Sequence, residues 1–256
     1  MVLGGLASAC AGDTYYWLVG DFKANQMGDA TDLANWSVQF DSSTKRPIAD
    51  AHPTRLPTLD DTLCAYRDFF FDLNGGSIAF DKMNEAASAD PYGINAWGSI
   101  GYCWQFTNGT FTVKTLNARI RAADHFTVWD GARFVCTDRF TAGDGMGGDG
   151  IMTMNVEPGG VFDTSAATYN SYNGRLNVKA GATAVLGTIG ILSGTQTTSW
   201  IKNWGDCTLT KGIVYPSSTA AAALAVYQEA GTMTLGGPVS RNGATPTLSF
   251  AVNGGK

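Results

Sequence analysis

The sequence has few charged residues, and this scarcity limits the partners that the chain can have. Charged residues make up 15% of the 256 residues, where an average soluble protein has roughly 25%. Lysine and arginine together number 17, no cluster of them exceeds the pair Lys45–Arg46, and the net charge is −5. Because the phosphates of nucleic acids reward basic surfaces, this balance argues against a nucleic acid as the partner.

Long hydrophobic runs and metal-type cysteine spacings are also missing. No apolar run reaches the roughly 18–20 residues of a membrane-spanning helix. The five cysteines contain no C-x-x-C spacing, so the sequence shows no zinc or redox motif. The last four could form one or two disulfides if the chain is secreted, or they could be buried thiols that act as small apolar residues. These four are Cys64, Cys103, Cys136 and Cys207.

The first eleven residues are interpreted as the remnant of an export signal. They are small and apolar, and Ala9–Ala11 has the A-x-A form of a signal-peptidase site. A buried first strand is the alternative, because no basic segment precedes the apolar run. We expect residues 1–11 to be the signal remnant, residues 12–105 to form an N-terminal cap with the first coils, and residues 106–256 to form further coils.

Glycine is abundant, at 32 residues, and it recurs at the end of a short alternating motif. Phe126–Phe134 reads FTVWDGARF, Met154–Phe162 reads MNVEPGGVF, and Leu176–Ala184 reads LNVKAGATA. The glycines of successive motifs are 22 to 28 residues apart, and a spacing of roughly 20–30 residues is typical of a solenoid. The six glycines are Gly109, Gly131, Gly159, Gly181, Gly205 and Gly231.

The motif predicts one corner of a coil in a parallel β-helix. Alternation of apolar and polar residues indicates strands, and strands this short bury their apolar faces only by stacking on the next coil. The apolar residue stands three positions before the glycine at Val178, but four before it in the last two copies, at Ile201 and Tyr227. A one-residue slip reverses the faces of a strand, so a bulge or loop must absorb it.

Two features leave alternatives open. Ser217–Ala230 is rich in good helix formers, but its second half, Leu224–Gln228, falls in register with the repeat and is predicted as a strand. A β-sandwich binding domain is the alternative architecture, and it would have strands roughly every 8–12 residues without the longer repeat.

The N-terminal part is dense in aromatic residues, as suits the cap of a solenoid, and it carries three short motifs in order. These motifs resemble the N-terminal module of secreted bacterial β-helix surface proteins of the autotransporter-passenger-like kind. The resemblance implies an all-β fold, a right-handed parallel β-helix, located on the cell surface or outside the cell, and it brings no catalytic residues. The motifs are Tyr15 with Trp17, then Asn35–Ser37, then Pro57 with Asp61 and Thr62.

No pattern of residues identifies a catalytic site. His52 and His125 lie in no metal or triad motif, and we expect each to be a satisfied loop or surface histidine. Asp60 and Asp61 are neighbours that would face opposite sides of a strand, so a turn or cap is the preferred role. Acids and bases of stacked coils could still gather on one face, as in polysaccharide-cleaving β-helix enzymes. The candidates are Asp124, Asp130, Asp138 and Asp144 with Arg119, Arg121, Arg133 and Arg139.

Two groups of residues are candidates for ligand binding. The loop Ala142–Gly150 holds Asp144 and Asp149 among glycines, and two carboxylates with free carbonyls could bind Ca²⁺; an insertion loop is the alternative. Aromatic residues could form a strip that contacts sugar rings, although core and cap packing is their commoner use. The strip would comprise Trp97, Tyr102, Trp104, Trp129, Trp200 and Trp204, with Asp130 beside Trp129.

These observations favour a non-catalytic structural or adhesive protein that displays its surface to extracellular glycans or to host or neighbouring cells. No cofactor is expected apart from the candidate Ca²⁺. A carbohydrate-active enzyme on the same fold, such as a polysaccharide lyase, a hydrolase or a phage-type depolymerase, is the alternative function.

Overall fold

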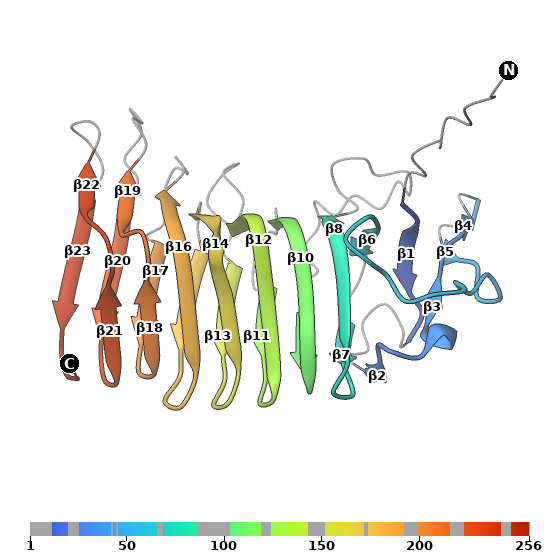
Figure 1. The fold of residues 1–256 in the computed structure, drawn as a ribbon, viewed down its shortest axis with the longest axis horizontal. Coiled ribbons are helices and arrows are strands. Elements are labelled where there is room, and N and C mark those ends of the chain that lie inside the picture. Colours follow the sequence, from blue (N-terminus) through green and yellow to red (C-terminus); the bar gives the residue numbers. More distant parts are fainter. Residues whose placement is uncertain are drawn as a thin grey trace, which may run out of the picture.

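The chain forms an elongated rod of stacked coils, with its N-terminal strands at one end and its C-terminal strands at the other (Figure 1). Residues 1–11, where the export signal is expected, lie outside the described residues. The computed structural model describes residues 12–19, 26–41, 43–44, 46–65, 69–85, 103–118, 124–142, 152–171, 174–191, 199–215, 223–241 and 247–255.

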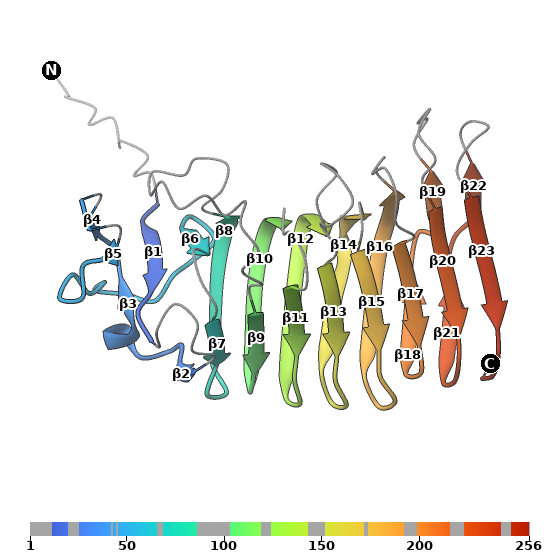
Figure 2. The same cartoon turned by 180° about the vertical axis from the view of Figure 1, so that it is seen from behind.

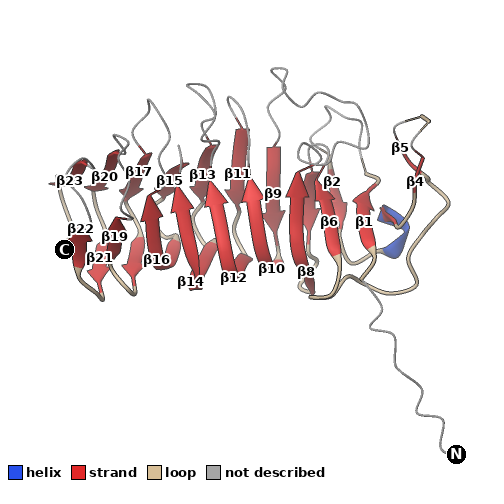
Figure 3. Cartoon of the chain, turned by 90° about the horizontal axis from the view of Figure 1, so that it is seen from above, coloured by secondary structure: helices blue, strands red, loops and turns tan. Residues whose placement is uncertain are grey.

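Two sheets run along the rod and face each other across its core (Figures 2 and 3). In the described part of the chain, one sheet has nine strands, all paired in parallel. Its strand order is β2 (Met27–Asp29), β7 (Phe69–Asp72), β9 (Cys103–Thr107), β11 (Asp124–Val128), β13 (Met152–Val156), β15 (Gly174–Val178), β17 (Ser199–Asn203), β20 (Ala223–Gln228) and β23 (Thr247–Val252).

The other sheet has twelve strands in the described residues, and each of its central strands follows a strand of the nine-stranded sheet after a short turn. Its strand order is β21 (Thr232–Leu235), β18 (Asp206–Leu209), β16 (Thr183–Ile191), β14 (Val161–Ser171), β12 (Ala132–Ala142), β10 (Gly109–Ala118), β8 (Ser77–Glu85), β6 (Thr62–Ala65), β1 (Thr14–Trp17) and β3 (Trp36–Ser37), with β19 (Ile213–Tyr215) and β22 (Val239–Arg241) beside this path.

The register of the coils is the one that the repeat predicts. Val128 pairs with Phe106 of the preceding coil and with Val156 of the next, and Val156 pairs with Val178. All four side chains are buried. The parallel β-helix is therefore confirmed, and the β-sandwich alternative is wrong, because neighbouring coils pair in parallel at the spacing of the repeat.

Glycine marks the turn between the two sheets. Gly131, Gly159, Gly181 and Gly231 have φ values of 69°, 80°, 80° and 67°, a left-handed conformation that costs side-chain-bearing residues energy. Gly205 is different, because its φ is outside this region and its constraint is space. A Cβ atom there would lie 2.3 Å from the backbone oxygen of Lys179.

The slip in the last two motifs is absorbed by a shorter turn. The column of Val178 continues through Asn203 and Gln228, so the core position in the last motif is taken by Gln228 and not by Tyr227. Only two residues separate Asn203 from the next sheet, at Asp206, whereas four separate Val178 from Thr183. The Asn203 side chain binds the backbone of this short turn, with its oxygen 3.2 Å from the Gly205 nitrogen.

Each long strand of the twelve-stranded sheet also bends at a second corner. The pairing of β10 with β12 shifts register after Val113, and that of β14 with β16 shifts after Thr164. In the last coils the same strand divides into β18 with β19 and into β21 with β22, so that β16 pairs with both β18 and β19. The described part of each central coil therefore has three sides, one in the nine-stranded sheet and two in the twelve-stranded sheet, on either side of the bend.

Stacked aromatic rings fill the core between the sheets. The rings of Phe111, Phe134 and Phe162 stack in register, with centroids 5.6 and 5.5 Å apart. Phe140 stacks on Tyr169 in the same way, at 5.6 Å. Because each coil adds one ring to the column, the apolar area that every coil buries depends on its neighbours.

The first coil is closed by the aromatic-rich cap that the sequence predicts. Trp17 and Trp36 are buried and pack edge to face at 4.8 Å, and Tyr15 meets Trp36 in the same way. β1 pairs in parallel with β6, but β3 pairs antiparallel with β1, so the parallel stacking ends there. The 3-10 turn η1 (Leu33–Asn35) and the hairpin of β4 (Phe40–Asp41) and β5 (Arg46–Pro47) complete the cap.

Two further sequence predictions are tested by these strands. Leu224–Gln228 lies in β20 and is a strand as predicted; residues 216–222 lie outside the described residues. Cys136 and Cys207 are buried thiols that form no disulfide, and burial raises the pKa of each to about 12. They act as small apolar core residues, which is one of the two roles considered for them.

A candidate ligand-binding face on the nine-stranded sheet

Side chains of the nine-stranded sheet alternate between the core and the outer face, and the outer face carries an array of amides, cations and aromatic rings. This outer face lies on the side of the rod seen in Figure 2. Its central residues are Gln105, Thr127, Thr153, Asn155, Arg175, Asn177, Trp200, Lys202 and Tyr227, which stand in two neighbouring columns set by the strand register. We call this set the outer array.

Trp129 extends the outer array at the turn after β11. Its backbone nitrogen donates to the Phe106 oxygen at 2.9 Å, and its indole Nε1 donates to the side-chain oxygen of Gln105 at 2.7 Å. Both contacts reach back to the preceding coil and fix the indole over it. The residue remains 39% exposed, whereas Gln105, whose side chain holds it, is 7% exposed, so a fixed apolar ring is accessible from solvent.

Two of the three amides of the outer array are bonded to each other along the rod. Asn177 Nδ2 donates to Asn155 Oδ1 at 3.0 Å, and Trp200 Nε1 lies 3.4 Å from Asn177 Oδ1. Amide side chains present both donors and acceptors, and these are half-buried rather than covered. Such groups can bind the hydroxyls of a sugar, and their mutual bonds hold them in position.

Cations and aromatic rings alternate in the next coils of the array. The guanidinium carbon of Arg175 lies 4.0 Å from the centroid of the Trp200 ring. Lys202 Nζ lies 4.7 Å from the same ring and 5.3 Å from that of Tyr227. At the neighbouring turn, Lys179 Nζ lies 5.7 Å from Trp204. Each distance is within the range of cation–π attraction.

The structure assigns different places to the residues that the sequence offered for ligand binding. Trp104 faces the core, is 1% exposed and stacks on Phe69 at 5.6 Å, so its prediction as a ligand residue is wrong. Trp129 is on the surface, as such a role requires. Asp130 is exposed in the turn beside it and leans over Gly159. Trp97, Tyr102, Asp144 and Asp149 lie outside the described residues.

The aspartates proposed for an enzyme do not meet in the described part of the chain. Asp130 lies at the glycine turn and Asp138 at the second bend of β12, separated by roughly 20 Å of extended strand. Asp138 accepts a hydrogen bond from Thr115 at 3.3 Å. Arg133 is bound to Asp163 at 2.5 Å. The side chain of Asp124, and the residues Asp144, Arg119 and Arg121, lie outside the described set.

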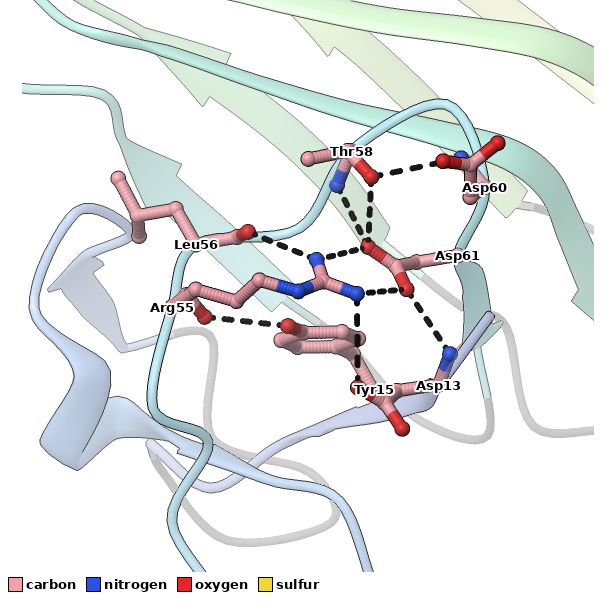
Figure 4. Close-up of polar contacts among 7 residues, drawn as sticks. All are labelled: Asp13, Tyr15, Arg55, Leu56, Thr58, Asp60 and Asp61. Atoms are coloured by element: carbon pink, nitrogen blue, oxygen red, sulfur yellow. Dashed lines mark hydrogen bonds and ion pairs between the residues drawn. The ribbon is translucent and has the colours of Figure 1, made fainter. Parts of the chain in front are cut away.

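A second polar group lies at the cap, and it is structural. Figure 4 shows the guanidinium of Arg55 bound to both carboxylate oxygens of Asp61, at 2.5 and 2.8 Å. The same carboxylate accepts from the backbone nitrogens of Asp13 and Thr58, at 2.8 and 2.7 Å. It thereby ties the start of β1 to the loop before β6, which is the turn or cap role predicted from sequence.

The electrostatics of Asp61 agree with this role. Burial of its fully covered side chain would raise its pKa, but the bonds from Arg55 and from the two backbone nitrogens outweigh burial and hold the pKa at about 2. Burial raises the pKa of the nearby Tyr15 to about 12, and its hydroxyl donates to the Arg55 backbone oxygen at 3.0 Å. A carboxylate that is enclosed and fully bonded has no lone pair left for a substrate.

The remaining candidates bind within the chain or form no cluster. His52 Nδ1 lies 3.0 Å from the backbone oxygen of Trp36, so it is a satisfied loop histidine, as predicted; the side chain of His125 is outside the described set. No group of three or more metal-binding side chains occurs in the described residues. In the same ranges no helix has the length and hydropathy that a bilayer crossing requires.

Comparison of the chain with protein-family models, with curated proteins and with solved structures finds no match.

Sequence reasoning missed most of the outer array. Trp200 was included in the aromatic strip, but Arg175, Lys202 and Tyr227 were not identified as its neighbours. Their proximity depends on strand register, since Arg175 pairs with Trp200 and Lys202 with Tyr227. The sequence does contain a pattern that identifies these neighbours, namely R-x-N in β15, W-x-K in β17 and A-x-Y in β20. The pattern becomes visible only when the strands are aligned on Val178 and Asn203.

Proposed function

We propose that this protein is a non-catalytic structural and adhesive β-helix on the outside of a bacterial cell, and that it binds glycans through the outer array. The observation that carries the proposal is the accessible Trp129 ring, which is held by Gln105 in the same column as the half-buried, mutually bonded amides of Asn155 and Asn177. An apolar ring face next to oriented amides matches a sugar, which has apolar C–H faces and hydroxyl edges. The rod itself supports an adhesive role, because stacked coils form one extended surface along its length.

The extracellular location rests on sequence features. The A-x-A segment at Ala9–Ala11, the resemblance of the N-terminal motifs and the low charge all favour export. The test is protease treatment of intact cells of the source organism, followed by detection of the chain. Digestion without lysis supports a surface location, and protection until lysis contradicts it.

Glycan binding is tested with an array of neutral and acidic glycans. We expect the full chain to bind a subset of them, and we expect Trp129→Ala to weaken that binding roughly tenfold, because a buried stacking contact contributes on the order of 1–1.5 kcal/mol. Leu59→Ala is the matched control, since Leu59 is also a large exposed apolar residue, at 47%, but lies outside the array. Binding that is absent, or lost equally in both variants, would contradict the proposal.

The enzymatic alternative receives no support from the described aspartates, and its test is simple. Incubation with a panel of polysaccharides should release no new reducing ends and no unsaturated sugars. Cleavage that Asp130→Asn or Asp138→Asn abolishes would replace the adhesive proposal with a catalytic one.

A further inference from the structure

Three cations, two in the nine-stranded sheet and one at the turn after β15, have no carboxylate partner within the described residues. They are Arg175, Lys179 and Lys202, and none of the ion pairs in those ranges includes them. By contrast, Arg55, Lys82, Lys114 and Arg133 are each paired with a carboxylate. The chain has a net charge of −5, so these cations form a positive region on a protein that is negative overall.

Aromatic rings hold these cations in place. Trp200 lies under the guanidinium of Arg175 at 4.0 Å and within 4.7 Å of Lys202 Nζ, and Tyr227 continues the series on the far side of Lys202. Cation–π contacts limit the freedom of long side chains, so less entropy remains to be lost when a ligand binds. Because Arg175 and Lys202 already contact the Trp200 ring, this ring is less suited than that of Trp129 to stack on a neutral sugar.

The positions of the cations follow the axis of the rod. Arg175 lies in β15 and Lys202 in the adjacent strand β17, followed by Tyr227 in β20, and Figure 2 shows these strands side by side. Successive coils are about 4.8 Å apart, which is similar to the length that one sugar adds to an extended polysaccharide. A chain lying along the rod would therefore meet successive elements of the array with successive sugars.

We propose that the ligand of the outer array is an anionic polysaccharide, whose carboxylate or sulfate groups bind Arg175 and Lys202 while a sugar two or three units further along the chain contacts Trp129. This inference rests on the proposed function, and it adds the chemical class of the glycan. The planar guanidinium matches a carboxylate or sulfate with two parallel hydrogen bonds, and the ammonium of Lys202 adds a second point of charge. We prefer an anionic ligand to a neutral one because the positive charges of Arg175 and Lys202 would attract it.

The test compares polygalacturonate and heparin, as carboxylated and sulfated probes, with dextran as the neutral probe. Affinity of the full chain is measured at increasing salt by biolayer interferometry. We expect tight binding of at least one acidic probe, weak binding of dextran, and a fall in acidic-probe affinity as sodium chloride rises from about 50 to about 500 mM, because salt screens exposed charges.

Substitutions at Arg175 and Lys202 test whether these two cations bind the acidic probe. We expect R175Q/K202Q to lose roughly tenfold or more in affinity for the acidic probe, and R175K/K202R, which keeps both charges but not the guanidinium at position 175, to lose less. Lys211→Gln is the control, since it removes an exposed cation from the bend between β18 and β19. Circular dichroism must show that every variant is folded, and an unchanged affinity in folded R175Q/K202Q would overturn the inference, as would an equal loss in Lys211→Gln.

The outcomes separate this inference from the proposed function. Equal binding of dextran and both acidic probes overturns the anionic ligand but leaves glycan binding in place. Binding of no glycan at all overturns both. Equal affinity for single-stranded DNA, with the same loss in R175Q/K202Q, would show that the array binds polyanions in general and would also overturn the anionic polysaccharide as its ligand.

Discussion

The side-chain nitrogen of Asn203 lies 2.8 Å from the side-chain oxygen of Gln228 in the next coil, in a core column whose preceding members are all apolar. The same asparagine bonds to both backbone groups of Gly205, through its oxygen and its nitrogen. The turn after Asn203 is two residues shorter than the turn after Val178, so fewer backbone groups are available for hydrogen bonds within it. The side-chain amide of Asn203 makes hydrogen bonds in their place.

Asn203→Val is therefore expected to destabilise the protein by about 3 kcal/mol, because it leaves the buried nitrogen and oxygen of Gly205 and the amide of Gln228 without this partner. The measurement is urea unfolding followed by circular dichroism. Asn177→Val is the control, a change of the same type on the half-buried outer face, where less than about 1 kcal/mol should be lost. Equal losses would show that Asn203 has no special role in the turn.

The two kinds of turn glycine should respond differently to substitution. At Gly181 the nearest atom to an added Cβ is 3.7 Å away, so Gly181→Ala should cost only the strain of positive φ, about 1–2 kcal/mol. At Gly205 an added Cβ would lie 2.3 Å from the Lys179 oxygen and 2.4 Å from the Ala182 oxygen, and the coils must separate to accept it. Gly205→Ala should therefore be the more damaging.

Thermal unfolding of both glycine variants, with Lys179→Val as the control, tests this difference. Lys179 is half-buried at the same turn, and its replacement should change stability by no more than about 0.5 kcal/mol. If Gly181→Ala were as well tolerated as Lys179→Val, the backbone strain assigned to this corner would be wrong.

Asp61 should make stability depend on pH in the acid range. Its pKa is about 2 in the folded protein, below the value of about 3.9 for an unfolded aspartate. As the pH falls, the unfolded chain therefore takes up this proton before the folded protein does. Asp61 contributes about 2 kcal/mol to the free energy of unfolding, and this contribution is present above pH 4 and is lost as the pH falls towards 2. Asp61→Asn should remove that contribution and flatten the dependence over this window.

Asp60→Asn is the matched control for this experiment. Asp60 is exposed and adjacent in sequence, but it makes none of the bonds that join Asp61 to Arg55 and to β1. Its replacement should leave both stability at pH 7 and the acid dependence close to those of the original protein. A pH profile that is identical in Asp61→Asn and the original would contradict the assigned coupling.

The aromatic column should be most sensitive to substitution in the middle of the rod. Phe134 is buried between Phe111 and Phe162, so Phe134→Ala should cost about 3–5 kcal/mol. Phe250 lies in the last strand of the nine-stranded sheet and is 44% exposed, so the same change there should cost much less. Calorimetry of both variants tests whether stacking between coils supplies the core.

The coils could be predicted from the sequence because their signals are local. Alternation marks the strands, and a glycine with positive φ marks the turn, so Val128, Val156 and Val178 could be aligned without knowledge of the fold. The last motifs could not be aligned, since the turn after Asn203 is shorter and its closure depends on a side chain that resembles an exposed polar residue. This is why the core position of the last motif falls on Gln228, although Tyr227 is the apolar residue that marks the motif in the sequence.

The candidate site was less predictable, for a related reason. Trp104 and Gln105 are neighbours, and only the pairing of β9 with β7 and β11 places the tryptophan inside and the amide outside. The contact of Arg175 with Trp200 joins residues 25 positions apart, and it exists only in one register. Composition indicated that aromatic residues were available, but it could not indicate which of them reach the surface.

The most direct test of glycan binding by the outer array is hydroxyl-radical footprinting of the full chain, with and without a saturating acidic polysaccharide. Mass spectrometry then reports the change in oxidation of each side chain. We expect protection of Trp129, Trp200 and Tyr227, with no change at Leu59 and Leu235, which are each 47% exposed and lie outside the nine-stranded sheet. Protection at Leu59 or Leu235 without protection of the three aromatic residues would contradict glycan binding by the outer array.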